Sequence, residues 1–244
     1  MSKPNLFLRA FRKIFTPMLW GRTSAQLQCM ATSYSQFGED VMCSFLFAAG
    51  HKGFFVDVGA YHPMLYSNTS AFYFNGWRGI AVDANPEVAA LFGRFRPEDT
   101  FIHSAVGVGA GTVELAVFAE GTFNCTADQI DHVPERVRKT ARMVSVPLRT
   151  LASILEEQKV SSVDFLNVDC EGNDLNVLKS NDWTRWCPRV ICVEDHEENW
   201  GDSEIAHFLR GHGYLLKNRA VFSSIFVLDT AIQELGTRDS VPVV

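Results

Sequence analysis

The stretch FFVDVGAYHP, residues 54–63, decides the fold of this 244-residue chain. Its first five residues are apolar except for Asp57, and Gly59 follows them, which is typical of a buried strand that ends in a tight turn. In a doubly wound α/β sheet, a glycine just beyond the first strand lets a ligand approach the backbone closely. Nucleosides bind in this crevice, so the stretch predicts a nucleoside site at Asp57 and Gly59.

A second strand of the same kind follows along the chain. The stretch GIAVDANP, residues 79–86, places Asp83 at the strand end, where a carboxylate can accept hydrogen bonds from both hydroxyls of a ribose. The first loop lacks the remaining glycines of the G-x-G-x-x-G pattern, so it offers no cradle for a pyrophosphate. The two strands therefore favour an adenosine ligand without phosphates. The alternative on this fold is a nicotinamide-dependent oxidoreductase, which needs the missing glycines.

The alternation of short apolar runs with helical segments continues to residue 228. This pattern predicts one α/β domain over residues 33–244, with a mostly parallel sheet covered by helices on both faces. The last two runs are joined by a connection too short for a crossover helix, so they should pair antiparallel. The seven predicted strands are 54–58, 79–82, 101–105, 163–168, 189–193, 214–216 and 225–228, and the predicted helices are 38–49, 87–95, 151–159, 175–180 and 203–212.

Residues 111–148 interrupt this alternation. Strand-like runs at 112–118 and 143–147 flank a turn rich in Gly, Asn and Thr and a charged stretch at 128–142. Segments of this kind often carry ligand contacts. We therefore expect an excursion that contacts the substrate, with a simple linker as the alternative.

Acidic residues gather after the fourth and fifth strands. Asp169, Glu171 and Asp174 follow the fourth strand, and Glu194 and His196 follow the fifth. Carboxylates crowded at one sheet edge repel one another, which is unfavourable unless they have a function. They could orient an ammonium group, orient an acceptor hydroxyl or bind a divalent metal.

The net charge of −6 hides an asymmetry along the chain. Residues 1–22 hold five basic residues and no acidic one, so the remainder carries 17 basic against 28 acidic residues. A body this acidic argues against nucleic-acid binding, which depends on neutralising phosphates. No stretch reaches the roughly 18 uninterrupted apolar residues that a membrane-spanning helix needs. The six cysteines form no CxxC pair and no zinc-like spacing, which indicates reduced thiols and a cytoplasmic location.

Residues 1–32 form a lead-in that contains a basic amphipathic helix. Within residues 4–15, apolar residues recur at helical spacing with basic residues on the other side, and Pro17 should end the helix. Through residues 4–20 this segment could contact an anionic membrane surface, which would place the protein at the inner face of the membrane. The alternative is that the helix packs on the domain or on a second subunit, as in a homodimer.

Four groups of residues, in this order, resemble the FkbM family of methyltransferases over about residues 33–228. The resemblance implies a Rossmann-like class I methyltransferase fold with one antiparallel strand in seven, and S-adenosylmethionine as cofactor. It also implies methyl transfer to a hydroxyl of a sugar, glycan or other natural product. The stretches are SQFGED (35–40), FVDVGA (55–60), SNT (67–69) with GWRGI (76–80), and DCEG (169–172).

The same resemblance assigns roles to individual residues. Asp57, Gly59 and Asp83 would hold the cofactor, whereas Asp169 and Glu171 would line the reacting end. The YHP of residues 61–63 departs from the usual glycine-rich first loop. Ser104 and Ala105 belong to a loop after the third strand that, by topology, would cover the adenine edge, with a plain strand-to-turn transition as the alternative. The full cofactor-binding set is Gln36, Glu39 and Asp40, which would close the site, with Asp57, Gly59, Ala60, Asn68, Asp83, Ala84, Ser104, Ala105 and Asp169.

Methyl transfer to an alcohol also needs a base that takes the hydroxyl proton. His196 is the first candidate, with Glu194 or Glu171 orienting it, and His62 is the second. Either histidine could instead be a hydrogen-bonded loop residue. Two further functions stay open, a metal-dependent O-methyltransferase that uses Asp169 and neighbouring acids as ligands, and a binding module without activity. The expected partner is a small-molecule or glycan acceptor, and no metal ligand is assigned.

Overall fold

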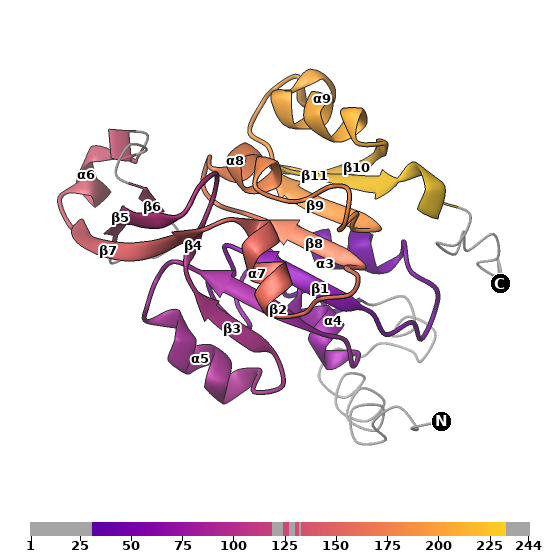
Figure 1. The fold of residues 1–244 in the computed structure, drawn as a ribbon, viewed down its shortest axis with the longest axis horizontal. Helices are drawn as coiled ribbons and strands as arrows, with labels where there is room; N and C mark the ends of the chain where they lie inside the picture. The colour runs from indigo at the N-terminus through magenta and orange to yellow at the C-terminus, as the bar shows by residue number, and fades with distance from the viewer. Residues whose placement is uncertain (1–30, 119–123, 127–129, 132, 233–244) are drawn as a thin grey trace, which may run out of the picture. The chain divides into compact units, whose positions relative to one another are not determined.

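Seven strands form the main sheet: β1 (Phe54–Val58), β2 (Arg78–Asp83), β3 (Thr100–His103), β8 (Phe165–Val168), β9 (Val190–Glu194), β10 (Tyr214–Ala220) and β11 (Ser223–Leu228). Their order is β10-β11-β9-β8-β1-β2-β3 (Figure 1). Strands β3, β2, β1, β8 and β9 are parallel neighbours, whereas β11 lies antiparallel between β9 and β10. The predicted architecture, mostly parallel with one antiparallel strand, is therefore confirmed.

This computed structural model describes residues 31–118, 124–126, 130–131 and 133–232. The described residues from Ser33 to Ile232 form one compact unit. The amphipathic helix expected at residues 4–15 lies outside the described residues. Within the described ranges, no helix is long and apolar enough to cross a membrane.

Helices cover both faces of the main sheet because alternate strand residues point to opposite sides. On one face, Val56 packs in a cluster with Ile154, whereas on the other Phe55 packs with Phe72. Thr150 and Ser203 cap two of the helices by accepting hydrogen bonds from backbone N–H groups. The helices are α7 (Leu151–Glu157), α8 (Asp174–Lys179) and α9 (Glu204–Gly211) on the first face, and α3 (Glu39–Ser44), α4 (Ser70–Phe74) and α5 (Val88–Phe95) on the second.

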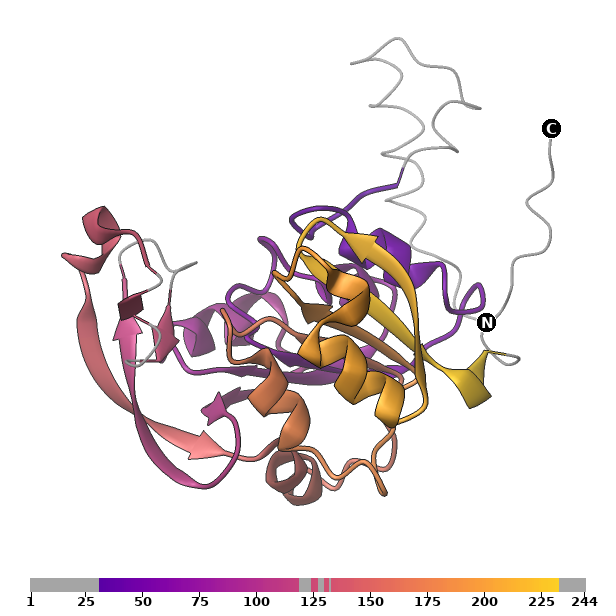
Figure 2. The same cartoon turned by 90° about the horizontal axis from the view of Figure 1, so that it is seen from above.

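A second sheet of four strands comes from the segment that interrupts the alternation (Figures 1 and 2). It contains β4 (Ala105–Val106), β5 (Gly111–Val117), β6 (Cys125–Thr126) and β7 (Arg142–Arg149), in the order β4-β7-β5-β6. The two strand-like runs expected there are β5 and β7, which pair antiparallel. The sequence did not predict a separate sheet, nor the short helices α6 (Glu135–Arg138), η3 (Trp200–Asp202) and η4 (Asp229–Ala231).

The run expected as a single strand at 101–105 is divided between the two sheets. The β3 strand pairs with β2 as far as His103, and the Ser104 N–H then donates to the Asp83 carbonyl. Ala105 instead pairs with Leu148 of β7. The chain thus leaves the main sheet at Ser104, and the second sheet begins beside the carboxyl edge of the first.

A fully buried arginine lies beneath that edge. The Arg96 guanidinium donates from Nε to Asp99 Oδ2 at 2.8 Å and from Nη1 to Thr69 Oγ1 at 3.0 Å. Thr69 in turn donates its hydroxyl proton to Asp57 on β1. The Arg96 guanidinium also lies over the ring of Phe55, 5.2 Å from the centroid. Two buried carboxylates therefore depend on one buried cation.

Replacing that cation tests its contribution to stability. Arg96→Met should lower the free energy of unfolding by about 3–5 kcal/mol, because it removes the buried positive charge that Asp99 and Asp57 share. Urea unfolding at pH 7 measures the change. Arg94→Met, on the exposed side of α5, is the matched control and should change stability by less than about 0.5 kcal/mol. A loss below about 1 kcal/mol for Arg96→Met would contradict this role.

Candidate functional site

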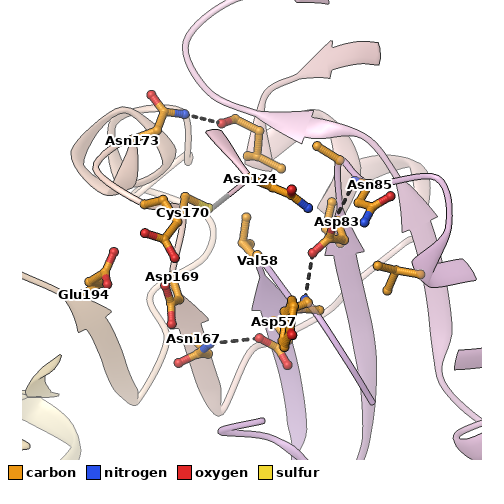
Figure 3. Close-up of a pocket in the computed structure, with 18 of the residues that line it drawn as sticks. Asp57, Val58, Asp83, Asn85, Asn124, Asn167, Asp169, Cys170, Asn173 and Glu194 are labelled. Carbon is orange, nitrogen blue, oxygen red and sulfur yellow. Dashed lines mark hydrogen bonds between the residues drawn. The ribbon is translucent and has the colours of Figure 1, made fainter. Parts of the chain in front are cut away.

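A cavity of about 510 Å³ lies at the carboxyl edge of the main sheet. This volume falls within the roughly 300–1,000 Å³ typical of small-molecule sites. Figure 3 shows Asp169 and Glu194 on one side of the cavity and Asp83 with Asn85 on the other, with Val58 between them. The loops after β1, β2, β8 and β9 thus meet where a doubly wound sheet places its ligand.

Gly59 brings the loops after β1 and β8 into contact. Its φ of +80° lies in the left-handed region, and a Cβ at this position would overlap the backbone carbonyl of Asp169. The Gly59 N–H donates to the Val82 carbonyl at 2.9 Å, and the Asp169 N–H donates to the Val58 carbonyl at 2.9 Å. The cavity floor is therefore backbone, which a ligand can approach closely.

Asp83 sits at the end of β2 with both carboxylate oxygens engaged by the backbone. Its Oδ2 accepts from the Tyr61 N–H and its Oδ1 from the Asn85 N–H, each at 2.7 Å. Burial raises the pKa of Asp83 to about 6, against the opposing effect of these hydrogen bonds. Each oxygen keeps a second lone pair. Asp83 is thus fixed in orientation and still able to accept hydrogen bonds from a diol.

Asp57 lies deeper than Asp83 and belongs to a buried polar chain. It accepts from Asn167 Nδ2 at 2.9 Å as well as from Thr69, and Asn68 Nδ2 donates to Asn167 Oδ1 at 2.9 Å. Burial raises the pKa of Asp57, and the charge of Arg96 opposes that rise. The carboxylate is therefore held rigidly in the cavity wall.

Four carboxylates crowd the ends of β8 and β9. Burial and the neighbouring Glu194 raise the pKa of Glu171 to about 8 and that of Asp174 to about 7. Burial, with Glu194 next in importance, also raises the pKa of Asp169 well above its usual range. Asp174 is engaged by the N–H groups of its own loop, at Cys170 and Gly172. The other three face the cavity as a cluster of acidic groups.

His196 adds a titratable base to this cluster. Its Nε2 lies 3.0 Å from Glu194 Oε1, and this hydrogen bond raises the pKa of the imidazole. The side chain is 56% exposed, so an acceptor can reach it from the cavity. The second oxygen of Glu194 is buried and has no hydrogen-bond partner in the described part of the chain.

His62, the second candidate base, has a different environment. Its Nδ1 accepts hydrogen bonds from the N–H groups of Met64 and Leu65, each at 3.0 Å, and burial lowers the pKa of the ring. His62 is not among the residues that line the cavity. Since Nδ1 is engaged by donors, the neutral ring carries its proton on Nε2 and has no free acceptor nitrogen. This geometry matches the alternative of a hydrogen-bonded loop residue.

The structure brings most of the predicted site residues together. His196, Glu194 and Glu171 line the cavity. Glu39 lines only a small adjoining hollow, where it accepts from Ser223 Oγ. Asp40 lines neither, because its carboxylate accepts from Ser33 and Ser35 and holds that segment in place. The predicted cofactor-binding residues that line the cavity are Gln36, Asp57, Gly59, Ala60, Asn68, Asp83, Ala84, Ser104, Ala105 and Asp169.

Other lining residues were not predicted individually. Asn167 is a polar residue inside an otherwise apolar strand, a signal that could have revealed it. Asn124 comes from the excursion expected to carry substrate contacts, and its side chain accepts from the Phe118 N–H. Tyr66 and Phe222 gave no sequence signal, because loop aromatics are common. In the described ranges, no group of three or more His, Cys, Asp or Glu side chains is arranged to hold a metal ion.

One comparison with known proteins identifies a family. A model of the methyltransferase FkbM domain matches residues 57–216. A search of curated protein sequences found no match. The matched residues make up more than half of the chain.

Several solved structures with low similarity to this chain are methyltransferases. An O-methyltransferase from Bacillus cereus in complex with SAH has 11% identity and a TM-score of 0.42, covering 89% of this chain and 95% of its own. A 1,6-didemethyltoxoflavin-N1-methyltransferase from Burkholderia thailandensis, with its substrate and S-adenosylhomocysteine bound, has 13% identity, a TM-score of 0.39 and coverages of 93% and 89%. A precorrin-6y C5,15-methyltransferase from Geobacter metallireducens has 15% identity, a TM-score of 0.39 and coverages of 82% and 94%.

The raised pKa of Glu171 predicts a pH-dependent loss of stability in the ligand-free protein. Because the pKa rises from 4.5 to about 8 on folding, the stability that protonation provides is complete below pH 4.5 and is lost as pH rises through about 8. Because Glu171 is exposed and solvent screens its charge, Glu171→Gln should raise the free energy of unfolding by only about 1 kcal/mol more at pH 8.5 than at pH 4.5.

Urea unfolding at the two pH values measures the difference. The exposed Glu198 is the matched control, and Glu198→Gln should change stability by less than about 0.5 kcal/mol at either pH. An equal effect of Glu171→Gln at both pH values would show that folding does not raise the pKa of its carboxyl.

Proposed function

Because this chain belongs to the FkbM methyltransferase family and is an S-adenosylmethionine-dependent methyltransferase, we propose that its acceptor is a hydroxyl group of a sugar, glycan or other small natural product. The observation that carries the proposal is the pair of Glu194 and His196, which borders the cavity opposite Asp83. Methylation of an alcohol needs a base at this place, because the hydroxyl proton must leave as the new bond forms.

The residues of the cavity fit an adenosyl cofactor. Asp83, oriented by two backbone N–H groups, would accept from the ribose hydroxyls. The close backbone contact at Gly59 would admit the chain that links ribose to sulfur, and Ser104 and Ala105 would border the adenine. Asp169 has no hydrogen bond to its carboxylate from the described residues and would hold the methionine ammonium.

When bound, S-adenosylmethionine supplies a methyl group on an activated sulfonium, and the electron pair of the broken C–S bond returns to sulfur. The protein then has to align the acceptor oxygen and accept one proton. Since Glu194 is an acceptor only, His196 donates its Nε2 proton to Glu194 and keeps Nδ1 as the basic nitrogen. The acceptor hydroxyl proton passes to Nδ1 as its oxygen bonds to the methyl carbon, and Glu194 stabilises the resulting imidazolium.

The proposal is tested by identifying the product. The enzyme is incubated with methyl-labelled S-adenosylmethionine and a panel of sugars, nucleotide sugars and lipid-linked glycans, with and without EDTA, and products are analysed by mass spectrometry. We expect one label on a hydroxyl oxygen of at least one acceptor. Asp83→Asn should weaken S-adenosylhomocysteine binding by about tenfold or more in calorimetry, because the amide offers fewer acceptor sites to a diol. Labelling of nitrogen or carbon alone would refute the hydroxyl acceptor.

The base is tested by the pH dependence of turnover. With wild-type enzyme, the rate should fall as pH drops through the pKa of His196, which Glu194 holds above its usual 6.5. His196→Asn should lower kcat by about 10²–10⁴-fold and remove this acidic limb. His62→Asn should keep kcat close to the wild-type value, because that ring lies outside the cavity lining. Near-normal turnover in His196→Asn would exclude the imidazole as the base.

A further inference from the structure

The cavity has an unusual balance of charge. Five carboxylates line it, and no Lys or Arg of the described residues does so. Such a lining favours cations, whose binding releases protons from these acids, and disfavours phosphates and carboxylates. Hydrogen-bond donors and positive charges within the protein compensate some of these carboxylates but not all of them. The carboxylates are those of Asp57, Asp83, Asp169, Glu171 and Glu194.

Two of the five have partners. Asp57 accepts from Thr69 and Asn167 and lies near the Arg96 charge, and Asp83 accepts two backbone N–H groups. Compensation therefore comes from the sheet and from the loop after β1. The carboxylates at the ends of β8 and β9 take no part in these contacts.

The other three lack such partners. Within the described residues, no donor is bonded to the carboxylates of Asp169 and Glu171, and the buried Oε2 of Glu194 is also unpaired. His196 is the charged partner of Glu194 only while protonated, and its role as a base requires the neutral ring. The methionine ammonium of the cofactor would offset one charge. Both glutamates, Glu171 and Glu194, then lack a cation when the base is ready to act.

Aromatic rings at the same end of the cavity point independently to a cationic ligand. Tyr66 and Phe222 line both the cavity and the small hollow beside it, and they are 57% and 44% exposed. The ring of Phe222 lies 5.2 Å from that of His196 and 5.6 Å from that of Phe37. Exposed aromatic faces beside carboxylates bind ammonium groups and the apolar faces of sugar rings.

We propose that the acceptor is an amine-bearing sugar or polyol, whose ammonium group is bound by Glu171 and Glu194 between Tyr66 and Phe222. This inference rests on the proposed function, since it names the substrate class of the same site. The bound amine keeps its proton and therefore has no lone pair for methylation. The neighbouring hydroxyl loses its proton to His196 and receives the methyl group.

Binding to the enzyme saturated with S-adenosylhomocysteine tests the proposal without turnover. The probes are the methyl glycosides of glucosamine, glucose, N-acetylglucosamine and glucuronic acid, titrated at pH 7. We expect the glucosamine glycoside to bind at least about tenfold more tightly than the neutral and acetylated ones, and the glucuronic acid glycoside to bind least.

Variants connect this preference to the two glutamates. Glu171→Gln and Glu194→Gln should each reduce the preference for the amine by about threefold or more, with S-adenosylhomocysteine affinity changed less than the amine preference. Glu198→Gln, an exposed acid on the loop after β9, should keep the full preference. Equal binding across the series, tighter binding of the acetylated or acidic glycoside, or no binding of the amine would overturn the proposal.

The two proposals fail in different ways. A hydroxyl product from neutral or acidic sugars alone would leave the proposed function intact and refute the amine-bearing acceptor. Labelling of nitrogen or carbon alone would refute the proposed methylation of a hydroxyl group, even if the amine binds tightly.

Discussion

The buried guanidinium of Arg96 is the interaction on which the cavity wall depends. Asp57 lies on the central strand β1, shielded from water, and a carboxylate in such a place requires both hydrogen bonds and a nearby positive charge. Thr69 supplies the link, because its hydroxyl accepts from Arg96 and donates to Asp57. The SNT stretch of residues 67–69 therefore has a structural role in this fold. Its Thr69 connects Arg96, at the end of helix α5, to Asp57 on strand β1 beneath the cavity.

The carboxylates on the two sides of the cavity differ in how many hydrogen bonds they receive from the protein. Near β1 and β2, Asp57 and Asp83 are oriented by hydrogen bonds from the protein. Near β8 and β9, burial and mutual repulsion raise the pKa values of Asp169 and Glu171. The acids near β1 and β2 thus have partners within the protein, whereas Asp169 and Glu171 have no hydrogen-bond donor among the described residues. A sulfonium donor and a cationic acceptor both suit such a site.

Sequence reasoning identified the features that depend on strand order. Gly59 and Asp83 follow apolar runs, and the carboxyl ends of parallel strands converge on one edge, so their proximity was predictable. Arg96 was not predictable, because its segment reads as the charged end of a helix and its burial comes from distant rings such as Phe55. The second sheet depends on pairing between β5 and β7, which no local pattern specifies. Asp40 belongs to a typical family stretch, yet its side chain organises residues 33–35 instead of lining the cavity.

In the proposed complex, Glu194 would couple recognition of the acceptor to removal of its proton. In the ligand-free protein, this carboxylate raises the pKa of His196 and so favours the imidazolium, which cannot act as a base. An ammonium bound at Glu194 cancels part of that field, and the pKa of the imidazole then falls. A bound amine would therefore favour the neutral ring, with Nδ1 free. A neutral acceptor would leave the field of Glu194 unchanged, so in the proposed complex the group that binds the amine would also lower the pKa of the base.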